Sequence, residues 1–253
     1  GKPTPFDALE FDEALAQIDT GYDLAFLLMD LDQRAGRAAA NRVLNRYVAR
    51  SGDAGLLAAL PLWLALRALV ALAYLRPAPP RLVAVGGLQG TGKSSLARLL
   101  APQLGAAPGA LLLRSDELRK RRFGLAPEER LPAEAYTEAV SLSIHDELFT
   151  KAEGALRHGH SVILDAVFLD AEHRAAAARL AARLVVPFQG FWLEAPMEML
   201  RRRILARRDD ASDATIAVLE RAATRDPGVI DWCRLDAAGD VLATALRTLG
   251  VKG

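Results

Sequence analysis

Apolar and polar positions follow two different patterns, one before and one after a proline-rich joint at Pro77-Ala78-Pro79-Pro80. Before the joint, apolar residues recur every three or four positions, which is the spacing of one face of a helix. After it, short apolar runs are separated by longer stretches with helical spacing. This second pattern predicts five strands, at 82–86, 110–114, 161–165, 187–193 and 232–236.

Helical segments are predicted between these strands, at 93–103, 116–122, 133–158, 171–184, 196–208, 213–224 and 239–248. Strands that alternate with helices favour a parallel sheet covered on both faces, with right-handed crossovers. We therefore expect residues 81–253 to form an α/β domain with a parallel five-stranded sheet. The stiff prolines predict a domain boundary just before it.

Residues 1–76 are predicted to form a small helical segment. Periodic apolar positions indicate helices around Leu24–Leu31 and over Arg37–Arg50, and the most apolar stretch of the chain runs from Gly55 to Leu75. Roughly 21 residues at 1.5 Å each could just cross a bilayer. Because Pro61 and Arg67 interrupt the stretch, a core helix is favoured over a membrane span.

Composition narrows the classes of partner. With 51% hydrophobic residues the chain can bury a substantial core, and 32 basic against 31 acidic residues give a formal net charge of +1. The chain as a whole has no excess of positive charge that would favour binding to nucleic acid. The single cysteine, Cys233, excludes an internal disulfide framework, and no signal peptide is recognised, so a cytoplasmic location is expected. The first residue is not methionine, which leaves a longer parent protein open.

The segment Gly87-Leu88-Gln89-Gly90-Thr91-Gly92-Lys93-Ser94 matches the phosphate-loop pattern G-x-x-x-x-G-K-[ST] and directly follows an apolar run. Its glycines allow positive φ angles and bring backbone N–H groups close to phosphate oxygens. Lys93 would reach the β- and γ-phosphates, and the Ser94 hydroxyl would bind magnesium. The residues expected to bind the nucleotide here are Gly87, Gly90, Thr91, Gly92, Lys93, Ser94 and Ser95. The alternative is a glycine-rich turn with a chance lysine.

Two further acids follow predicted strands. Asp116 comes after the strand at 110–114 with Arg119 close behind, and a carboxylate there can take a proton from an acceptor hydroxyl while an arginine holds the acceptor. Asp165 ends the run Val162-Ile163-Leu164-Asp165 in the manner of a Walker B element, which suits magnesium. Either acid could instead cap a helix. His145 and His173 stand alone on predicted helices, where packing or exposure is the favoured account.

The most charged stretch of the chain surrounds Arg203 and Arg207, which lie four residues apart on one helical face before a break at Asp209-Asp210-Ala211-Ser212. We expect a lid that closes on the polyphosphate and supplies a catalytic cation, for which Arg207 is the candidate. An ordinary basic helix surface is the alternative.

Taken together, residues 81–250 resemble the small P-loop kinases of the zeta-toxin-like and gluconate- or shikimate-kinase-like type, within the AAA-family ATP-binding domains. The resemblance is carried by the phosphate loop, Ser115-Asp116 with Arg119, Leu164-Asp165 with Arg174, and Leu235-Asp236-Ala237-Ala238-Gly239. It implies a three-layer P-loop NTPase fold that uses ATP and Mg²⁺. It also implies that Asp116 is the base, that Arg119 and Arg174 face the acceptor, and that the loop at Asp236 lies near the adenine.

The N-terminal 75 residues, especially Phe6–Asp12 and Tyr22–Leu31, resemble the C-terminal end of an aminoglycoside-phosphotransferase-like kinase lobe. In that family an aspartate at the position of Asp7 binds magnesium. The catalytic loop of the family would lie upstream of Gly1, so this piece alone is not a working kinase. Asp7 is either part of a site completed in a longer protein or an ordinary solvated acid.

These features favour a magnesium-dependent ATP phosphotransferase that acts on a small hydroxylated acceptor, a metabolite or an antibiotic-like molecule, with no nucleic-acid or membrane partner. The rival class is an ATP-driven switch module that controls a partner without phosphorylating an acceptor. The sequence leaves the acceptor and the oligomeric state open. Because every phosphate-contacting element follows the prolines, a chain starting near Arg81 is expected to bind ATP.

Overall fold

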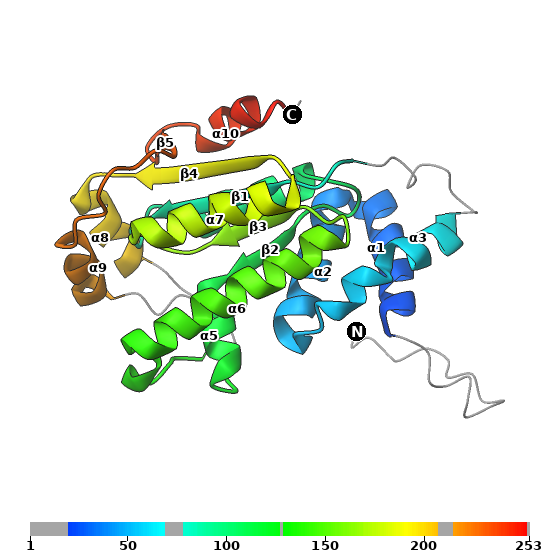
Figure 1. Cartoon of the computed structure of the whole chain (residues 1–253), viewed down its shortest axis with the longest axis horizontal. Helices are drawn as coiled ribbons and strands as arrows, with labels where there is room; N and C mark the ends of the chain where they lie inside the picture. The colour runs from blue at the N-terminus through cyan, green and yellow to red at the C-terminus, as the bar shows by residue number, and fades with distance from the viewer. Residues whose placement is uncertain (1–19, 69–77, 127–128, 207–214, 252–253) are drawn as a thin grey trace.

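The computed structural model describes residues 20–68, 78–126, 129–206 and 215–251 (Figure 1). At their centre is a sheet of five parallel strands in the order β2-β3-β1-β4-β5. The strands are β1 (Leu82–Gly87), β2 (Leu111–Arg114), β3 (Val162–Asp165), β4 (Phe188–Glu194) and β5 (Cys233–Asp236). Each predicted strand is present, with its ends within one residue of those expected. The predicted α/β class is confirmed.

The central strand β1 is buried along its whole length. Leu82 and Ala84 belong to the hydrophobic cluster on one face of the sheet, and Val83 and Val85 belong to the cluster on the other. Successive side chains of a strand point to opposite faces, so a strand covered on both sides requires a continuous apolar run. Residues 82–85 supply that run, which is why the sequence predicted this strand well.

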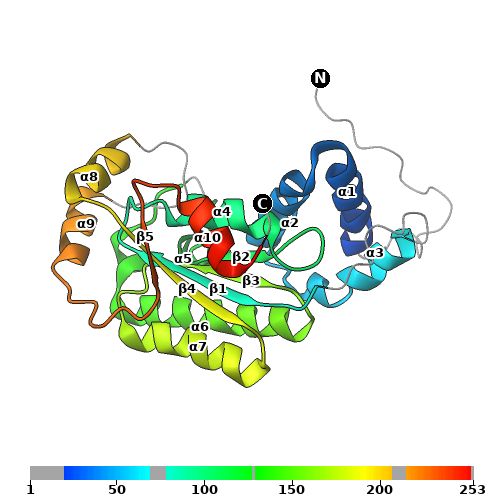
Figure 2. The same ribbon diagram turned by 90° about the horizontal axis from the view of Figure 1, so that it is seen from above.

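Helices cover both faces of the sheet (Figure 2). α4 (Lys93–Leu100) and α10 (Val241–Leu249) lie on one side, and α6 (Glu138–Arg157) and α7 (Ala171–Leu184) lie on the other. α5 (Ser115–Arg122) follows β2 directly, and α8 (Met197–Leu205) and α9 (Ile216–Ala223) follow β4. The strands therefore deliver their carboxyl ends to one edge of the sheet, where α4, α5 and α8 begin.

Two predicted helices start or end differently in the structure. The stretch predicted as one helix over 133–158 is a 3₁₀ turn, η4 (Ala133–Tyr136), followed by α6. Thr137 separates them because it is extended and its side chain accepts a hydrogen bond from the Val140 N–H, as a helix N-cap does. The helix predicted over 93–103 ends in the 3₁₀ turn η3 (Ala101–Gln103), which contains Pro102. The predicted helices 196–208 and 213–224 extend into residues 207–214, outside the described residues.

The N-terminal helices are α1 (Thr20–Ala35), α2 (Arg37–Ser51) and α3 (Leu60–Ala68), with the 3₁₀ turn η1 (Gly55–Ala58) before α3. The prediction of one helix from Gly55 is wrong at its start. Pro61 has no N–H and its ring excludes a preceding helical turn, so it is accepted only in the first turn of α3. Within the described residues, no helix combines the length and apolarity needed to cross a bilayer.

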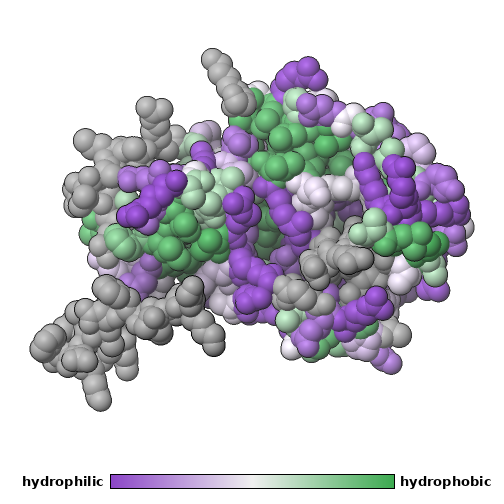
Figure 3. Space-filling model, turned by 180° about the vertical axis from the view of Figure 1, so that it is seen from behind, coloured by the Kyte–Doolittle hydropathy of each residue, from purple (hydrophilic) through white to green (hydrophobic). Residues whose placement is uncertain are grey.

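The N-terminal helices share a core with the sheet. Leu28, Leu44 and Leu57 belong to the same hydrophobic cluster as Leu111 and Leu164 of the strands. Other apolar side chains of this segment are exposed, among them Phe26 of α1 and Leu62 of α3. Seen from behind, the surface alternates between hydrophobic areas and bands of hydrophilic residues (Figure 3). The division into two domains at the prolines stays a prediction.

Helix α2 lies along β2, the edge strand of the sheet. The Asn45 side chain accepts a hydrogen bond from the Leu112 N–H and donates one to the Ala110 carbonyl at 3.3 Å. Asn41 donates to the same carbonyl at 3.0 Å. An uncovered edge strand presents backbone groups that other chains can pair with. The two asparagine amides supply the partners that a sixth strand would otherwise provide.

Candidate active site

The phosphate loop joins the end of β1 to the start of α4. Gly87, Gly90 and Gly92 have φ angles of 131°, 85° and 92°. A Cβ at Gly87 would lie 2.4 Å from the Leu193 carbonyl oxygen, and one at Gly90 would lie 2.9 Å from that of Leu200. Side-chain-bearing residues adopt such angles rarely. The positive φ angles predicted for these glycines are confirmed.

The loop wraps around the carbonyl group of Leu88. The Thr91 hydroxyl and the Lys93 ammonium group each donate a hydrogen bond to this oxygen at 2.8 Å. Thr91 is buried, so its role here is to shape the loop. The Lys93 ammonium group is held against the loop, at the N-terminus of α4, where the helix dipole also favours negative charge. A bound polyphosphate would therefore lie against both the Lys93 ammonium group and the positive end of the α4 dipole.

Arg203 of α8 connects the phosphate loop to the segment after β5. Its guanidinium donates to the carbonyl groups of Gly90 and Thr91, both at 3.4 Å, and to that of Ala237 at 3.0 Å. Asp236 is exposed, and its carboxylate accepts a hydrogen bond from the Ala238 N–H, which shapes the turn. Arg203 thus ties the phosphate loop to the turn after β5. Arg207, the candidate catalytic cation of the lid, lies outside the described residues.

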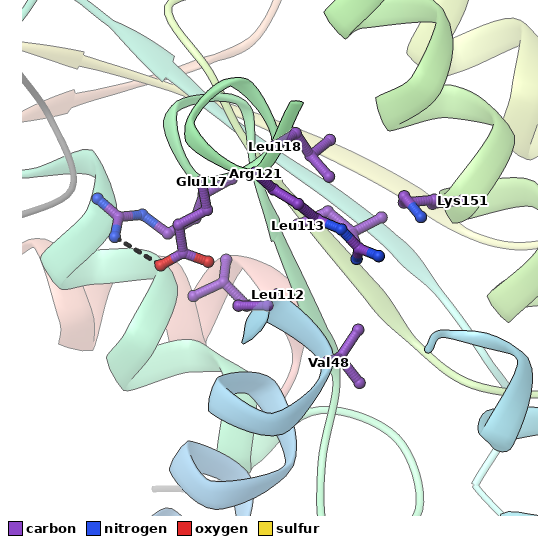
Figure 4. A pocket seen from close by; sticks show the side chains of 9 residues that line it. Val48, Leu112, Leu113, Glu117, Leu118, Arg121 and Lys151 are labelled. Carbon is purple, nitrogen blue, oxygen red and sulfur yellow. Dashed lines mark hydrogen bonds and ion pairs between the residues drawn. The ribbon is translucent and has the colours of Figure 1, made fainter. Parts of the chain in front are cut away.

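Arg114, the last residue of β2, joins three elements of the site. Its Nε donates to Asp165 at 3.1 Å and its Nη2 donates to the Ser94 hydroxyl at 3.1 Å. Its Nη1 donates to Glu117 at 2.9 Å, the pair joined by the dashed line in Figure 4. Arg114 is 3% exposed. This role of Arg114 was not predicted from the sequence, although an arginine at the end of the apolar run Leu111-Leu112-Leu113 was a signal, because a buried charge needs partners.

Asp116 and Arg119 lie together in α5. Asp116 is half-buried in the first turn, and Arg119, 8% exposed, follows one turn later. The Arg119 guanidinium donates to the Ala135 carbonyl and lies 5.2 Å from the centre of the Tyr136 ring. Burial lowers the pKa of Arg119, and Asp116 and then Tyr136 oppose that shift. The two side chains form a charged group after β2, and β3 lies between β2 and the strand that leads into the phosphate loop.

Arg174 of α7 is buried among backbone carbonyl groups. Its guanidinium donates to Phe168 and Leu169 on one side and to Pro227 and Val229 on the other. These bonds tie the loop after β3 to the segment before β5. They give Arg174 a structural role, and its expected contact with an acceptor stays a prediction.

His145 of α6 and His173 of α7, isolated in the sequence, are stacked with their ring centres 3.8 Å apart. His145 also meets the edge of Phe168 at 6.0 Å. Burial lowers the pKa of His145 to about 4, with further lowering from His173 and Arg119 and an opposing effect of Asp170. His145 is therefore uncharged at neutral pH, and its ring packs against His173 and Phe168.

A cavity of about 400 Å³ lies beside the phosphate loop. Leu88 and Thr91 line it from the loop and Trp192 from β4, and Met197 and Ala222 line it from α8 and α9. Its walls are mostly apolar, with Arg225 and Glu194 as charged side chains. It is large enough for part of a small molecule.

The structure brings most of the predicted site residues to one edge of the sheet. Lys93 and Ser94 begin α4, and Asp165 ends β3, the strand next to β1. Asp116 and Arg119 lie on α5, which Arg114 ties to Asp165. Ser95 is exposed on α4 and Asp236 is exposed at the end of β5, and their expected contacts with the nucleotide stay predictions.

Ser94 and Asp165 suit a hard cation. Both accept a hydrogen bond from the same group, the Arg114 guanidinium, so a cationic group already lies between them. Within the described residues, no three His, Cys, Asp or Glu side chains gather as a metal cluster. Mg²⁺ is commonly held by one or two protein oxygens together with substrate phosphates. The residues present fit that kind of site.

The strand order, the glycine loop and its lysine define a P-loop kinase-like domain of the three-layer α/β type. The chain belongs to the AAA domain family, whose model matches residues 82–225. It is 32% identical over 269 residues to an uncharacterized protein of Mycobacterium tuberculosis, in a match that covers 94% of this chain and 53% of the relative. The chain thus spans about half the length of that curated relative.

One curated relative has a named activity, and it is a kinase. Over 120 residues the chain is 32% identical to the adenylyl-sulfate kinase of Myxococcus xanthus, which covers 46% of this chain and 59% of that kinase. The structure of the Mycobacterium tuberculosis APS kinase, solved in complex with AMPPNP and APS, has a TM-score of 0.51 at 22% identity. That match covers 69% of this chain and 98% of the other, and it supports the fold.

Proposed function

We propose that this chain is a magnesium-dependent ATP phosphotransferase, working in the cytoplasm, whose acceptor is a small hydroxylated molecule. The observation that supports the proposal most strongly is the convergence of a phosphate loop with acids from two neighbouring strands at one edge of the sheet. Lys93, Ser94, Asp165 and Asp116 all lie there. The kinase names of the relatives support the same class.

In this proposal the loop N–H groups and Lys93 bind the β- and γ-phosphates. Ser94 and Asp165 would hold magnesium, which when bound would supply positive charge to the phosphate oxygens. Asp116 takes the proton of the acceptor hydroxyl as that oxygen forms a bond to the γ-phosphorus. The bond between the γ-phosphorus and the bridging oxygen breaks, and ADP leaves with that oxygen. Arg119 and a lid arginine, for which Arg207 is the candidate, stabilise the transferring group.

The alternative is an ATP-driven switch that phosphorylates no acceptor. An enzyme requires a pocket beyond the γ-phosphate with a base and a cation, and Asp116 with Arg119 favours that reading. A switch would release ADP at a rate that no small molecule raises. We also keep as a proposal that residues 1–76 belong to an aminoglycoside-phosphotransferase-like lobe; its marker residue, Asp7, lies outside the described residues.

The test is ADP release from ATP in the presence of hydroxylated acceptors, starting with adenylyl sulfate, gluconate, shikimate and an aminoglycoside. Lys93→Ala is expected to abolish turnover with an unchanged melting temperature, because it removes the loop cation from the phosphates. Chelation of magnesium is expected to do the same.

Lys151→Ala is the matched control. Lys151 lies on α6 and pairs with Glu147 at 3.6 Å, so this variant is expected to keep wild-type turnover. Equal turnover in Lys93→Ala and wild type would rule out the phosphate-loop mechanism. ADP release that no acceptor accelerates would favour the switch.

A further inference from the structure

Arg114 occupies the position where the site would be expected to hold a metal ion. Its guanidinium donates to Ser94 and to Asp165, both at 3.1 Å, and these are the two residues proposed as magnesium ligands. The β2–β3 register pairs Arg114 with Asp165, so the contact follows from neighbouring strand ends. Ser94 reaches the same guanidinium from the first turn of α4.

The charges around Arg114 explain why it is held in place. The side chains of Arg114, Asp165 and Glu117 are 2%, 5% and 18% exposed. Two carboxylates in so buried a place require a counter-charge, since an unpaired buried charge is costly. A planar guanidinium can bond to both while reaching the Ser94 hydroxyl, which a single ammonium group cannot do as well.

The surroundings of Glu117 leave little room for another ion on that side. A cavity of about 20 Å³ lies among Val48, Leu113, Glu117 and Lys151, enough for about one water molecule. Figure 4 shows Leu112 beside the Glu117 carboxylate, Leu113 next to Arg121, and Val48 and Lys151 further along the same pocket. On the other side of Arg114, its guanidinium is the cationic group that the structure shows bonded to Asp165, at 3.1 Å.

We propose that Arg114 is a positioning residue that acts as a built-in cation for Ser94 and Asp165, and that magnesium enters only with a nucleotide whose phosphates offset the added charge. The proposal rests on the function proposed above. With no metal bound, the guanidinium keeps the Ser94 hydroxyl and the Asp165 carboxylate facing each other. When Mg²⁺ binds Ser94, the bond from Arg114 Nη2 to that hydroxyl is given up, because the two cations repel each other.

The test measures melting temperature with millimolar magnesium and no nucleotide. Wild type is expected to show no change with magnesium. Arg114→Met is expected to melt about 10 °C lower, because two buried carboxylates lose their partner. Magnesium should restore at least half of that loss, since it can now enter beside Asp165. Arg114→Lys should show a smaller loss and a smaller recovery, and it carries the same test if Arg114→Met does not fold.

Arg174→Met is the matched control, with Arg174→Lys beside it. Arg174 is as buried as Arg114, but its guanidinium donates to four backbone carbonyl groups, so its variants should lose stability without recovering any in magnesium. A magnesium response that is equal in wild type and in the Arg114 variants overturns the proposal.

Calorimetry of ATP binding to the wild type separates this proposal from the proposed function. If wild type binds no ATP while the Arg114 variants respond to magnesium, the phosphotransferase proposal and the entry of magnesium with a nucleotide both fail, and only the role of Arg114 as a built-in cation stands. If ATP binds and turns over while the Arg114 variants show no response to magnesium, the phosphotransferase proposal stands and the built-in cation fails.

Discussion

The two halves of the site are built in different ways. The phosphate loop, residues 87–94, is shaped by backbone conformation and by contacts a few residues apart, such as those of Thr91 and Lys93 with Leu88. The proposed acceptor half, Asp116 and Arg119 of α5 together with Arg114, is shaped by side chains that meet across the fold. Arg114 contacts Asp165, 51 residues away, and Arg119 contacts Ala135.

The acceptor half also depends on the N-terminal helices. Arg121 of α5 donates to the Ser51 carbonyl at 3.0 Å, and Asn45 of α2 binds the backbone of β2 beside Arg114. Gly52 has a φ of 68°, which favours glycine, and a Cβ there would force the Arg121 guanidinium to move. The comparison teaches that nucleotide binding is encoded locally, whereas the position of Asp116 depends on segments on both sides of the prolines.

The largest expected effect is that Asp116→Asn separates chemistry from nucleotide binding. The amide keeps the shape of the side chain but cannot take the acceptor proton, and general-base assistance is worth about two to four orders of magnitude. Acceptor phosphorylation should fall at least about a hundredfold while ATP affinity, measured by calorimetry, changes little. Near wild-type phosphorylation would make Asp116 a helix cap and would leave the acceptor half without its base.

A smaller effect, on the loop half, is expected from Gly87→Ala. The added Cβ would meet the Leu193 carbonyl oxygen at a φ of 131°, so unfolding free energy should fall by about 3 kcal/mol and ATP affinity should fall with it. Urea unfolding measures the change in unfolding free energy, and calorimetry measures the change in ATP affinity.

Gly124→Ala is the matched control for Gly87→Ala. Gly124 also has a positive φ, 68°, but a Cβ there has no atom within 4 Å, so only about 1 kcal/mol should be lost and ATP affinity should be unchanged. If both variants lose the same stability and ATP affinity, the close approach of the β4 backbone to Gly87 does not shape the loop.

The smallest expected effect comes from Asn45→Ala, which tests the link between α2 and the acceptor half. It leaves the Leu112 N–H without its side-chain acceptor, so stability should fall by about 2 kcal/mol. Arg42→Ala, an exposed position on the same helix, should stay within about 0.5 kcal/mol of wild type. Acceptor phosphorylation should fall more than ATP binding in Asn45→Ala. An equal fall in both would remove the distinction between the two halves.

A chain starting near Arg81 would remove α2 altogether. Such a chain is expected to bind ATP because the phosphate loop lies downstream of Arg81. That expectation stays a prediction. The structure adds that the Ala110 carbonyl and the Leu112 N–H would then lose their asparagine partners at the sheet edge. We expect that shortened chain to aggregate more readily than the full chain.

By itself the sequence determined the strands, the parallel α/β class and the phosphate loop, because these depend on the period of apolar residues and on glycines at fixed spacing. It could not determine the role of Arg114, the stacking of His145 on His173 or the cover that α2 gives to β2. Those contacts join residues far apart in the chain, and only the packing of strand ends and helices brings them within hydrogen-bonding distance. The error at Gly55 has a local cause instead: apolar spacing continues through Gly55, but Pro61 is accepted only in the first turn of a helix, so α3 begins at Leu60.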